Sequence, residues 1–194
     1  RVIAAGRRWR DLTPTEAGQL VAEIGRELLP KFGDGKFQAG GAARFAGEFL
    51  IERLRRLVTA LVAWMPQYDF DPSVSEIAFD DDQVGMPAWR IELGDGHALR
   101  LRGRIDRVDL CRLDGHTALA VVMDYKSRVR KLDPTKLHHG LELQLLSYLG
   151  VLKHLPRTGE LFGGQRLVPT GVFYIPLNGG GGKSSSNRAQ VLAS

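Results

Sequence analysis

Two aspartates and a lysine lie on two neighbouring segments whose composition is typical of β-strands. Asp106 lies in the segment GRIDRVD, and Asp124 and Lys126 lie in the segment VVMDYKS. A short polar turn containing Asp114-Gly115, a dipeptide favoured in tight hairpins, joins the two segments. In a hairpin centred on that turn, the numbers of paired residues sum to about 229 or 230, and Asp106 and Asp124 sum to 230. We therefore expect the two acids to lie opposite each other or one residue out of register.

This spacing suits metal-assisted cleavage of a phosphodiester. Opposed Cβ atoms in an antiparallel pair lie about 5 Å apart, so the two carboxylates can share one divalent cation. Such a cation neutralises the phosphate and lowers the pKa of an attacking water. Lys126 is two residues after Asp124 and therefore points to the same face of the strand, where it can stabilise developing charge. The same three residues could instead form a cross-strand ion pair, so the spacing alone leaves both interpretations open.

A predicted helix follows these strands and carries two further polar side chains. In the segment GLELQLLSYLG, Gln144 and Tyr148 are four residues apart and share one helix face. The apolar stripe predicted beside them consists of Leu141, Leu145, Leu149 and Leu152. Packed along the sheet, this helix can place an amide and a phenol near the cation.

The remaining pattern predicts helices, then strands, then a helix and a last strand. Thr13, Pro14 and Glu16 form a helix start with a capping box. The predicted helices span about 13–29, 42–65 and 136–154, and the predicted strands span 73–79, 89–93, 98–110, 118–126 and 171–177. We predict a mixed α/β (α+β) fold, with a central mixed β-sheet that contains an antiparallel meander and is flanked by helices. The predicted organisation is an N-terminal helical extension at 1–41, a core at 42–178 and a flexible Gly/Ser-rich tail at 179–194.

Composition narrows the class of protein. Lysine and arginine number 27 against 22 acidic residues, a net charge of +5, which suits a polyanionic partner without requiring one. The single cysteine, Cys111, excludes an internal disulfide and any cysteine-based zinc or iron–sulfur site built from this chain alone. We therefore expect a reducing, cytoplasmic setting. No apolar run reaches the roughly 18 residues of a membrane span, and a start at Arg1 without Met indicates a piece of a longer protein.

The segments GRIDRVD, DYKS and G-L-x-L-Q-L-L-x-Y, in this order and spacing, resemble the PD-(D/E)xK nuclease superfamily in its RecB-type branch. Within that branch the chain is most similar to the nuclease domain at the C-terminal end of the AddB subunits of AddAB helicase–nucleases. The resemblance covers roughly residues 42–177. It implies a restriction-endonuclease-like fold and Mg²⁺-dependent cleavage, with Mn²⁺ as a substitute. The implied substrate is a single DNA strand delivered by a helicase-type partner during double-strand-break repair and recombination.

The resemblance also implies roles for individual residues. Asp106 and Asp124 would be metal ligands together with the backbone carbonyl of Tyr125, and Lys126 would be the catalytic lysine. The supporting motif and the upstream acid of the first strand would be supplied by Gln144, Tyr148 and Glu76; the last could equally be an acid on a strand surface. Many relatives carry four cysteines that bind an iron–sulfur cluster, and this fragment cannot build one.

Several alternatives remain open from the sequence. The enzymatic alternative is a stand-alone RecB-like exonuclease, and the alternative from another class is a DNA-binding scaffold with an idle site. The arginines of the 42–65 helix could form a solvated face or a ridge along a phosphate backbone. Arg104 and Arg107 could tune the site or contact DNA, or could form salt bridges with acids such as Asp109.

Overall fold

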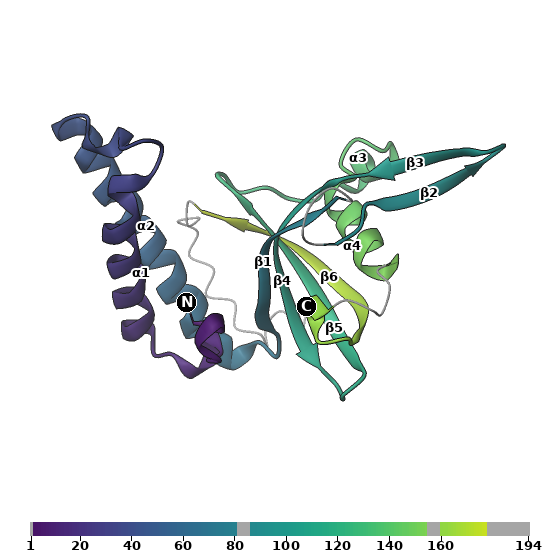
Figure 1. The fold of residues 1–194 in the computed structure, drawn as a ribbon, viewed down its shortest axis with the longest axis horizontal. Coiled ribbons are helices and arrows are strands. Elements are labelled where there is room, and N and C mark those ends of the chain that lie inside the picture. Colours follow the sequence, from purple (N-terminus) through teal and green to yellow (C-terminus); the bar gives the residue numbers. More distant parts are fainter. Residues whose placement is uncertain (1, 81–85, 155–159, 178–194) are drawn as a thin grey trace.

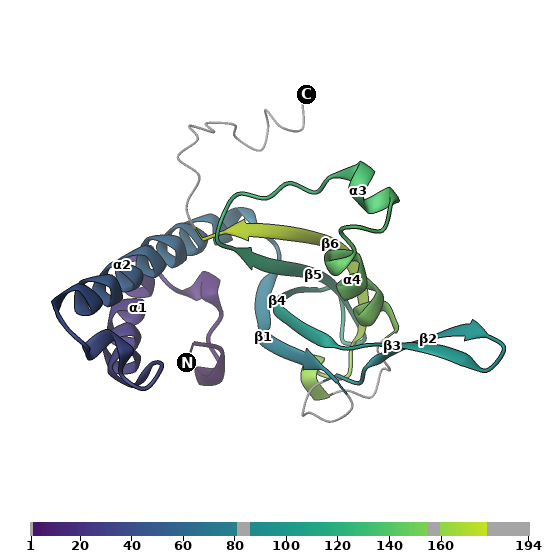
Figure 2. The same cartoon turned by 90° about the horizontal axis from the view of Figure 1, so that it is seen from above.

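The computed structural model describes residues 2–80, 86–154 and 160–177 (Figure 1). Its helices are α1 (Pro14–Leu28), α2 (Gly41–Trp64), α3 (Pro134–His138) and α4 (Gln144–His154). Its strands are β1 (Asp71–Phe79), β2 (Trp89–Gly94), β3 (His97–Leu101), β4 (Gly103–Arg112), β5 (Thr117–Lys126) and β6 (Arg166–Pro176). The sheet stands between α4 on one side and the α1–α2 hairpin on the other (Figures 1 and 2).

The central sheet is mixed, as predicted. Its strand order is β1-β4-β5-β6, with antiparallel β1/β4 and β4/β5 pairs and a parallel β5/β6 pair. The predicted meander holds for β1, β4 and β5 only. Strands β2 and β3 pair with each other in a separate two-stranded sheet, which projects from the body (Figure 1). The single strand predicted over 98–110 is divided at Arg102, where the chain leaves this arm and enters the central sheet.

The hairpin of β4 and β5 has the predicted register. Arg107 pairs with Met123, so the numbers of paired residues sum to 230. The turn is held by Asp114, whose Oδ1 accepts hydrogen bonds from the backbone N–H groups of His116 and Thr117 at 2.7 and 2.6 Å. A short side chain that satisfies two backbone donors fixes a tight turn and, with it, the strand register.

One face of the sheet forms the main core with α4. From the helix, Leu145, Tyr148, Val151 and Leu152 pack against buried residues of β4 and β5. The predicted helix over 136–154 is instead two helices, because Gly140 takes a positive φ of 71° and ends α3. As a result Leu141, predicted in the core stripe, lies outside α4 and is 74% exposed.

The opposite face of the sheet is covered by the start of the chain and the end of α2. Met65 and Tyr68 form a second core cluster with Val121 and Met123 of β5, and Trp9 packs against it. Arg10 secures this N-terminal segment, since its Nε donates to Asp71 at 2.7 Å and its Nη2 donates to the carbonyl of Tyr68 at 2.9 Å. The first twelve residues are therefore part of the packing behind the sheet.

Helices α1 and α2 form a hairpin that leans away from the sheet (Figures 1 and 2). The predicted capping box is present: Thr13 Oγ1 accepts from the N–H of Glu16, and the Glu16 carboxylate accepts from the N–H of Thr13. The predicted apolar face of α2 is largely uncovered, however, with Phe45 71% exposed. Trp64, predicted in the core, is 44% exposed because the hairpin meets the body only at its base. Within the described ranges no helix has the length and apolar character needed to cross a membrane.

Candidate active site

Strands β4 and β5 separate at the two predicted acids. The last pair of the β4–β5 ladder is Arg107 with Met123, and the next residues on the two strands are Asp106 and Asp124. Beyond this point β4 pairs only with β1, whereas β5 stays paired with β6 as far as Lys126. We call this opening, formed by Asp106 and by residues 124–126, the strand fork.

The acid on β4 takes over a hydrogen bond that the ladder no longer makes. Asp106 Oδ2 accepts from the backbone N–H of Tyr125 at 2.7 Å. The carbonyl of Lys126 accepts from the N–H of Leu177 at 2.8 Å, so the backbone polar groups of Lys126 face the β6 side. Because these groups alternate sides along a strand, the N–H and carbonyl of Tyr125 face β4 and the fork.

Asp124 is a buried carboxylate at the base of the fork. It is 2% exposed, and its Oδ2 forms an ion pair with Lys126 Nζ at 2.5 Å. The same oxygen accepts no hydrogen bond from the part of the chain that the structure describes. A buried charge needs strong partners, so an oxygen in this position is suited to a metal cation.

A chain of polar contacts continues from Lys126 into α4. Lys126 Nζ donates to Gln144 Oε1 at 3.2 Å, and Gln144 Nε2 donates to the Tyr148 hydroxyl at 2.8 Å. The Tyr148 ring packs edge-on against Phe79, with ring centres 6.0 Å apart. Burial raises the pKa of the Tyr148 phenol, and the nearby negative charge of Asp124 adds to that effect. The phenol therefore stays protonated at neutral pH.

Glu76 does not join this chain of contacts. The pairing of Ser75 with Arg107 and of Ile77 with Ile105 sets Glu76 across from Asp106 in the β1–β4 register. However, Glu76 takes a positive φ of 53°, which interrupts the regular pleat of β1. Its side chain is exposed, with Oε2 3.7 Å from Arg104 Nη1. Its role in the site remains a prediction.

Three residues that the sequence did not single out lie beside the cluster. The ring of Tyr174 on β6 has Lys126 Nζ at 5.4 Å and the Arg130 guanidinium at 5.6 Å from its centre. Arg130 Nη2 also donates to Glu142 Oε1 at 3.1 Å, and this hydrogen bond lowers the pKa of the Glu142 carboxyl. The pairing of Asp124 with Tyr174 depends on the parallel β5/β6 register, for which the sequence carries no local signal.

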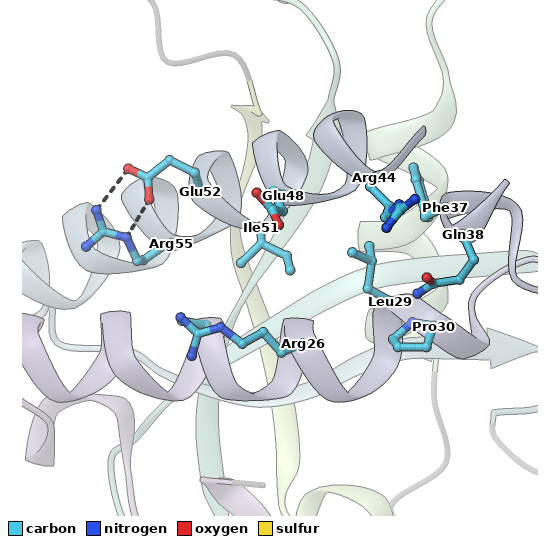
Figure 3. A pocket seen from close by; sticks show the side chains of 11 residues that line it. Arg26, Leu29, Pro30, Phe37, Gln38, Arg44, Glu48, Ile51, Glu52 and Arg55 are labelled. Atoms are coloured by element: carbon cyan, nitrogen blue, oxygen red, sulfur yellow. Dashed lines mark hydrogen bonds and ion pairs between the residues drawn. The ribbon is translucent and has the colours of Figure 1, made fainter. Parts of the chain in front are cut away.

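A cavity of about 500 Å³ lies apart from the fork, within the helical hairpin (Figure 3). None of the predicted site residues lines it. On its border Glu52 accepts hydrogen bonds from Arg55 and Arg56, each at 2.7 Å at the shortest. These arginines are neutralised by an acid of their own helix, which favours the solvated face over the phosphate-binding ridge.

The residues at the fork fit a hard divalent cation. Mg²⁺ favours one or two carboxylates and retains several waters, and the fork offers Asp106, Asp124 and the Tyr125 carbonyl. The orphaned Oδ2 of Asp124 supports this fit. Over the described ranges, no group of three or more His, Cys, Asp or Glu side chains could hold a metal, so backbone and water ligands would have to complete the site. Cys111 is the only cysteine, and an iron–sulfur cluster cannot be built from this chain.

A mixed sheet that forks between two aspartates, with a lysine beside them and a helix behind, has the architecture of the restriction-endonuclease-like nucleases. The chain belongs to the PD-(D/E)XK nuclease superfamily, whose family model matches residues 4–193. The fold and the family predicted from the sequence are thereby confirmed.

Curated relatives refine this assignment, and each of them is the large subunit designated B of an ATP-dependent helicase/deoxyribonuclease. The chain is 33% identical over 178 residues to the relative from Symbiobacterium thermophilum, and the match covers 89% of this chain and 14% of the relative. It is 32% identical over 174 residues to the relative from Ruminiclostridium cellulolyticum, covering 88% and 14%. The relative from Exiguobacterium sibiricum is 28% identical over 174 residues, covering 90% and 15%. The chain thus spans about a seventh of the length of these relatives.

Proposed function

We propose that this chain is a metal-dependent DNA nuclease domain that hydrolyses phosphodiester bonds in a single DNA strand. The observation that carries the proposal is the polar chain that runs from buried Asp124 through Lys126 and Gln144 to Tyr148. The relatives are named as subunits of an ATP-dependent helicase/deoxyribonuclease. We therefore propose that the domain acts with a helicase-type partner in double-strand-break repair and recombination, in the cytoplasm.

Asp106, Asp124 and the Tyr125 carbonyl would hold Mg²⁺ or Mn²⁺. When bound, the cation supplies charge neutralisation at the phosphate and a water of lowered pKa. Asp106 can serve as a ligand while it keeps its hydrogen bond, because only Oδ2 is engaged by the Tyr125 N–H. The hydrogen bond fixes the rotamer of Asp106 and so limits the reorganisation needed for binding.

Lys126 supplies positive charge next to the reacting phosphate. Its side chain is 22% exposed, so its ammonium can reach both the interior carboxylate and a bound strand. Contacts with Asp124 and with Gln144 hold Nζ in one place before substrate arrives. Such preorganised charge acts on the transition state without a reorganisation cost at the moment of reaction. Tyr148, protonated and buried, holds Gln144 in the orientation that presents Oε1 to the lysine.

The direct test is cleavage of end-labelled DNA by the 194-residue chain. Single-stranded and double-stranded substrates would be incubated with Mg²⁺, Mn²⁺ or EDTA, and with Lys126→Ala. Lys153→Ala is the matched control, since Lys153 is exposed at the opposite end of α4 from Gln144. We expect metal-dependent cleavage that is lost in Lys126→Ala and kept in Lys153→Ala, with circular dichroism verifying that both variants fold.

Two results would count against the proposal. Cleavage that persists in Lys126→Ala would remove the lysine from the chemistry. DNA binding that is equal with EDTA and with Mg²⁺, without cleavage under any condition, would favour the idle scaffold. The labelled end also reports the polarity of digestion, which bears on the stand-alone exonuclease alternative.

A further inference from the structure

A buried charged pair lies behind the strand fork, on the opposite face of the sheet. Arg107 is 3% exposed and Asp109 is fully buried. Arg107 Nε and Nη2 each donate to a different oxygen of Asp109 at 2.6 Å, a bidentate contact. The salt bridge predicted as one alternative for Arg107 is therefore present. A buried ion pair contributes little net stability compared with apolar residues of the same volume, so its presence beside Asp106 calls for another explanation.

The guanidinium has one further donor, and this donor reaches the residue between the two functional side chains of β5. Arg107 Nη1 donates to the Tyr125 hydroxyl at 3.2 Å. Tyr125 follows Asp124 and precedes Lys126, and its side chain points to the reverse face because successive side chains alternate. Its backbone N–H donates to Asp106 on the β4 side. A contact behind the sheet is thus connected through one residue to the acid in front.

The strand fork explains why Tyr125 needs such an anchor. The β4–β5 ladder ends one pair before Asp124, so the backbone at Tyr125 has lost regular strand pairing on that side. Pairing with β6 continues, but it fixes only the other edge of β5. The Asp106 carboxylate and the phenol held by Arg107 are the contacts that remain for Tyr125 towards β4.

Arg107 itself is held rigidly. The Trp9 ring lies over the guanidinium, with 4.7 Å between the guanidinium carbon and the ring centre. Burial alone would lower the pKa of Arg107, but the hydrogen bonds and charge of Asp109 raise it overall, so the group stays charged. Held by Asp109 and covered by Trp9, the guanidinium presents its remaining donor in one direction.

We infer that Arg107 is a positioning residue of the active site: from behind the sheet it fixes the Tyr125 phenol and thereby sets the backbone between Asp124 and Lys126. That backbone carries the N–H that orients Asp106 and the carbonyl that faces the fork. The part of this inference that concerns metal binding rests on the proposed function. The N-terminal segment around Trp9 belongs to the same device, because it covers the guanidinium.

Two single-hydroxyl deletions in this buried cluster test the inference. Tyr125→Phe removes the acceptor of the Arg107 hydrogen bond. Tyr68→Phe is the matched control: its buried hydroxyl lies near Asp109 in the same cluster but makes no described contact with Tyr125. Arg107→Lys keeps the charge but loses the planar set of donors that reaches two partners at once.

The first readout is Mn²⁺ affinity, measured by calorimetry on the 194-residue chain without DNA. We expect Tyr125→Phe to weaken Mn²⁺ binding about tenfold and Arg107→Lys by at least as much, while Tyr68→Phe binds as the unsubstituted chain does. Thermal unfolding is measured in parallel. A merely structural role would lower the unfolding temperature in Tyr125→Phe and Tyr68→Phe alike and leave the affinity of the folded protein unchanged.

The second readout needs no metal: amide hydrogen exchange of Tyr125, followed by NMR in EDTA. Faster exchange in Tyr125→Phe than in Tyr68→Phe supports the positioning role. Equal exchange in both variants, or Mn²⁺ affinity in Tyr125→Phe equal to that of the unsubstituted chain, would overturn it. If the unsubstituted chain itself fails to bind Mn²⁺, the proposed function fails, and the exchange rates still decide whether Arg107 sets the backbone at Tyr125.

Discussion

Replacement of Lys126 by Met should destabilise the metal-free protein by about 3 kcal/mol, because it leaves a buried carboxylate without its counter-charge. Asp124 is 2% exposed, and its Oδ2 lies 2.5 Å from Lys126 Nζ. At an effective dielectric constant of about 20, two unit charges at that distance attract by roughly 7 kcal/mol. Desolvation of both groups and the partial exposure of the lysine cancel much of this attraction. The net loss therefore belongs at the lower end of the range for a broken buried pair.

A double-mutant cycle measures this energy. Urea unfolding in EDTA at pH 7 would be followed for Lys126→Met, Asp124→Asn and the double variant. The double variant carries no buried charge, so it should be more stable than Lys126→Met, with a coupling energy of about 1.5 kcal/mol or more. Lys153→Met, an exposed position on α4, should stay within about 0.5 kcal/mol of the unsubstituted chain.

Magnesium adds a second arm to the same experiment. A bound cation would supply the counter-charge that Lys126→Met lacks, so Mg²⁺ should raise the unfolding temperature of this variant more than that of the unsubstituted chain. Purely additive single substitutions, or a Lys126→Met variant as stable as Lys153→Met, would refute the view that the lysine compensates a buried carboxylate.

The other predictions concern the edges of the site. Gln144→Ala should lower kcat for cleavage about tenfold or more with little change in KM, because Lys126 loses a contact that fixes Nζ; a change in KM alone would contradict this. Tyr148→Phe should have a smaller effect in the same assay, since only the acceptor for Gln144 is lost. Glu76→Gln should keep cleavage within about threefold, because its exposed carboxylate meets Arg104 and not the acids; a complete loss would restore Glu76 to the site. The pKa of Glu142 lies below its ordinary value of 4.5, chiefly through its hydrogen bond with Arg130. The stabilisation that this carboxylate provides is therefore present above pH 4.5 and is lost as the pH falls below that value; urea unfolding from pH 6 to pH 3 should show Glu142→Gln converging with the unsubstituted chain at low pH.

The features that the sequence predicted correctly are those with local causes. The register of Asp106 and Asp124 follows from the Asp114-Gly115 turn, because turn geometry fixes the pairing of the strands beside it. The start of α1 follows from the capping box of Thr13 and Glu16, which needs only four consecutive residues. The spacing of Gln144 and Tyr148 on one helix face likewise holds within a single helical turn.

The features that it missed depend on contacts between distant segments. Tyr174 reaches the site through parallel pairing of β5 with β6, and Trp9 reaches Arg107 across about a hundred residues of sequence. The apolar face of α2 is periodic and was expected to be covered, but periodicity states which face is apolar and not what packs against it. The break at Gly140 shows the same limit, since the apolar spacing on both sides of the glycine predicts one continuous helix.

The strand fork gives Asp106 two separable duties. Its Oδ2 replaces a lost ladder acceptor for the Tyr125 N–H, and its charge is available to a cation. Asp106→Asn retains a side-chain oxygen that can accept that hydrogen bond but removes the charge. Asp106→Ala removes both and leaves a partly buried N–H without its acceptor, at a cost of about 1–3 kcal/mol. We therefore expect both variants to lose metal-dependent cleavage, but only Asp106→Ala to lose that stability in urea unfolding with EDTA. If the two variants were equally stable, the hydrogen bond to Tyr125 would not hold the strand, and Asp106 would serve the fork through its charge alone.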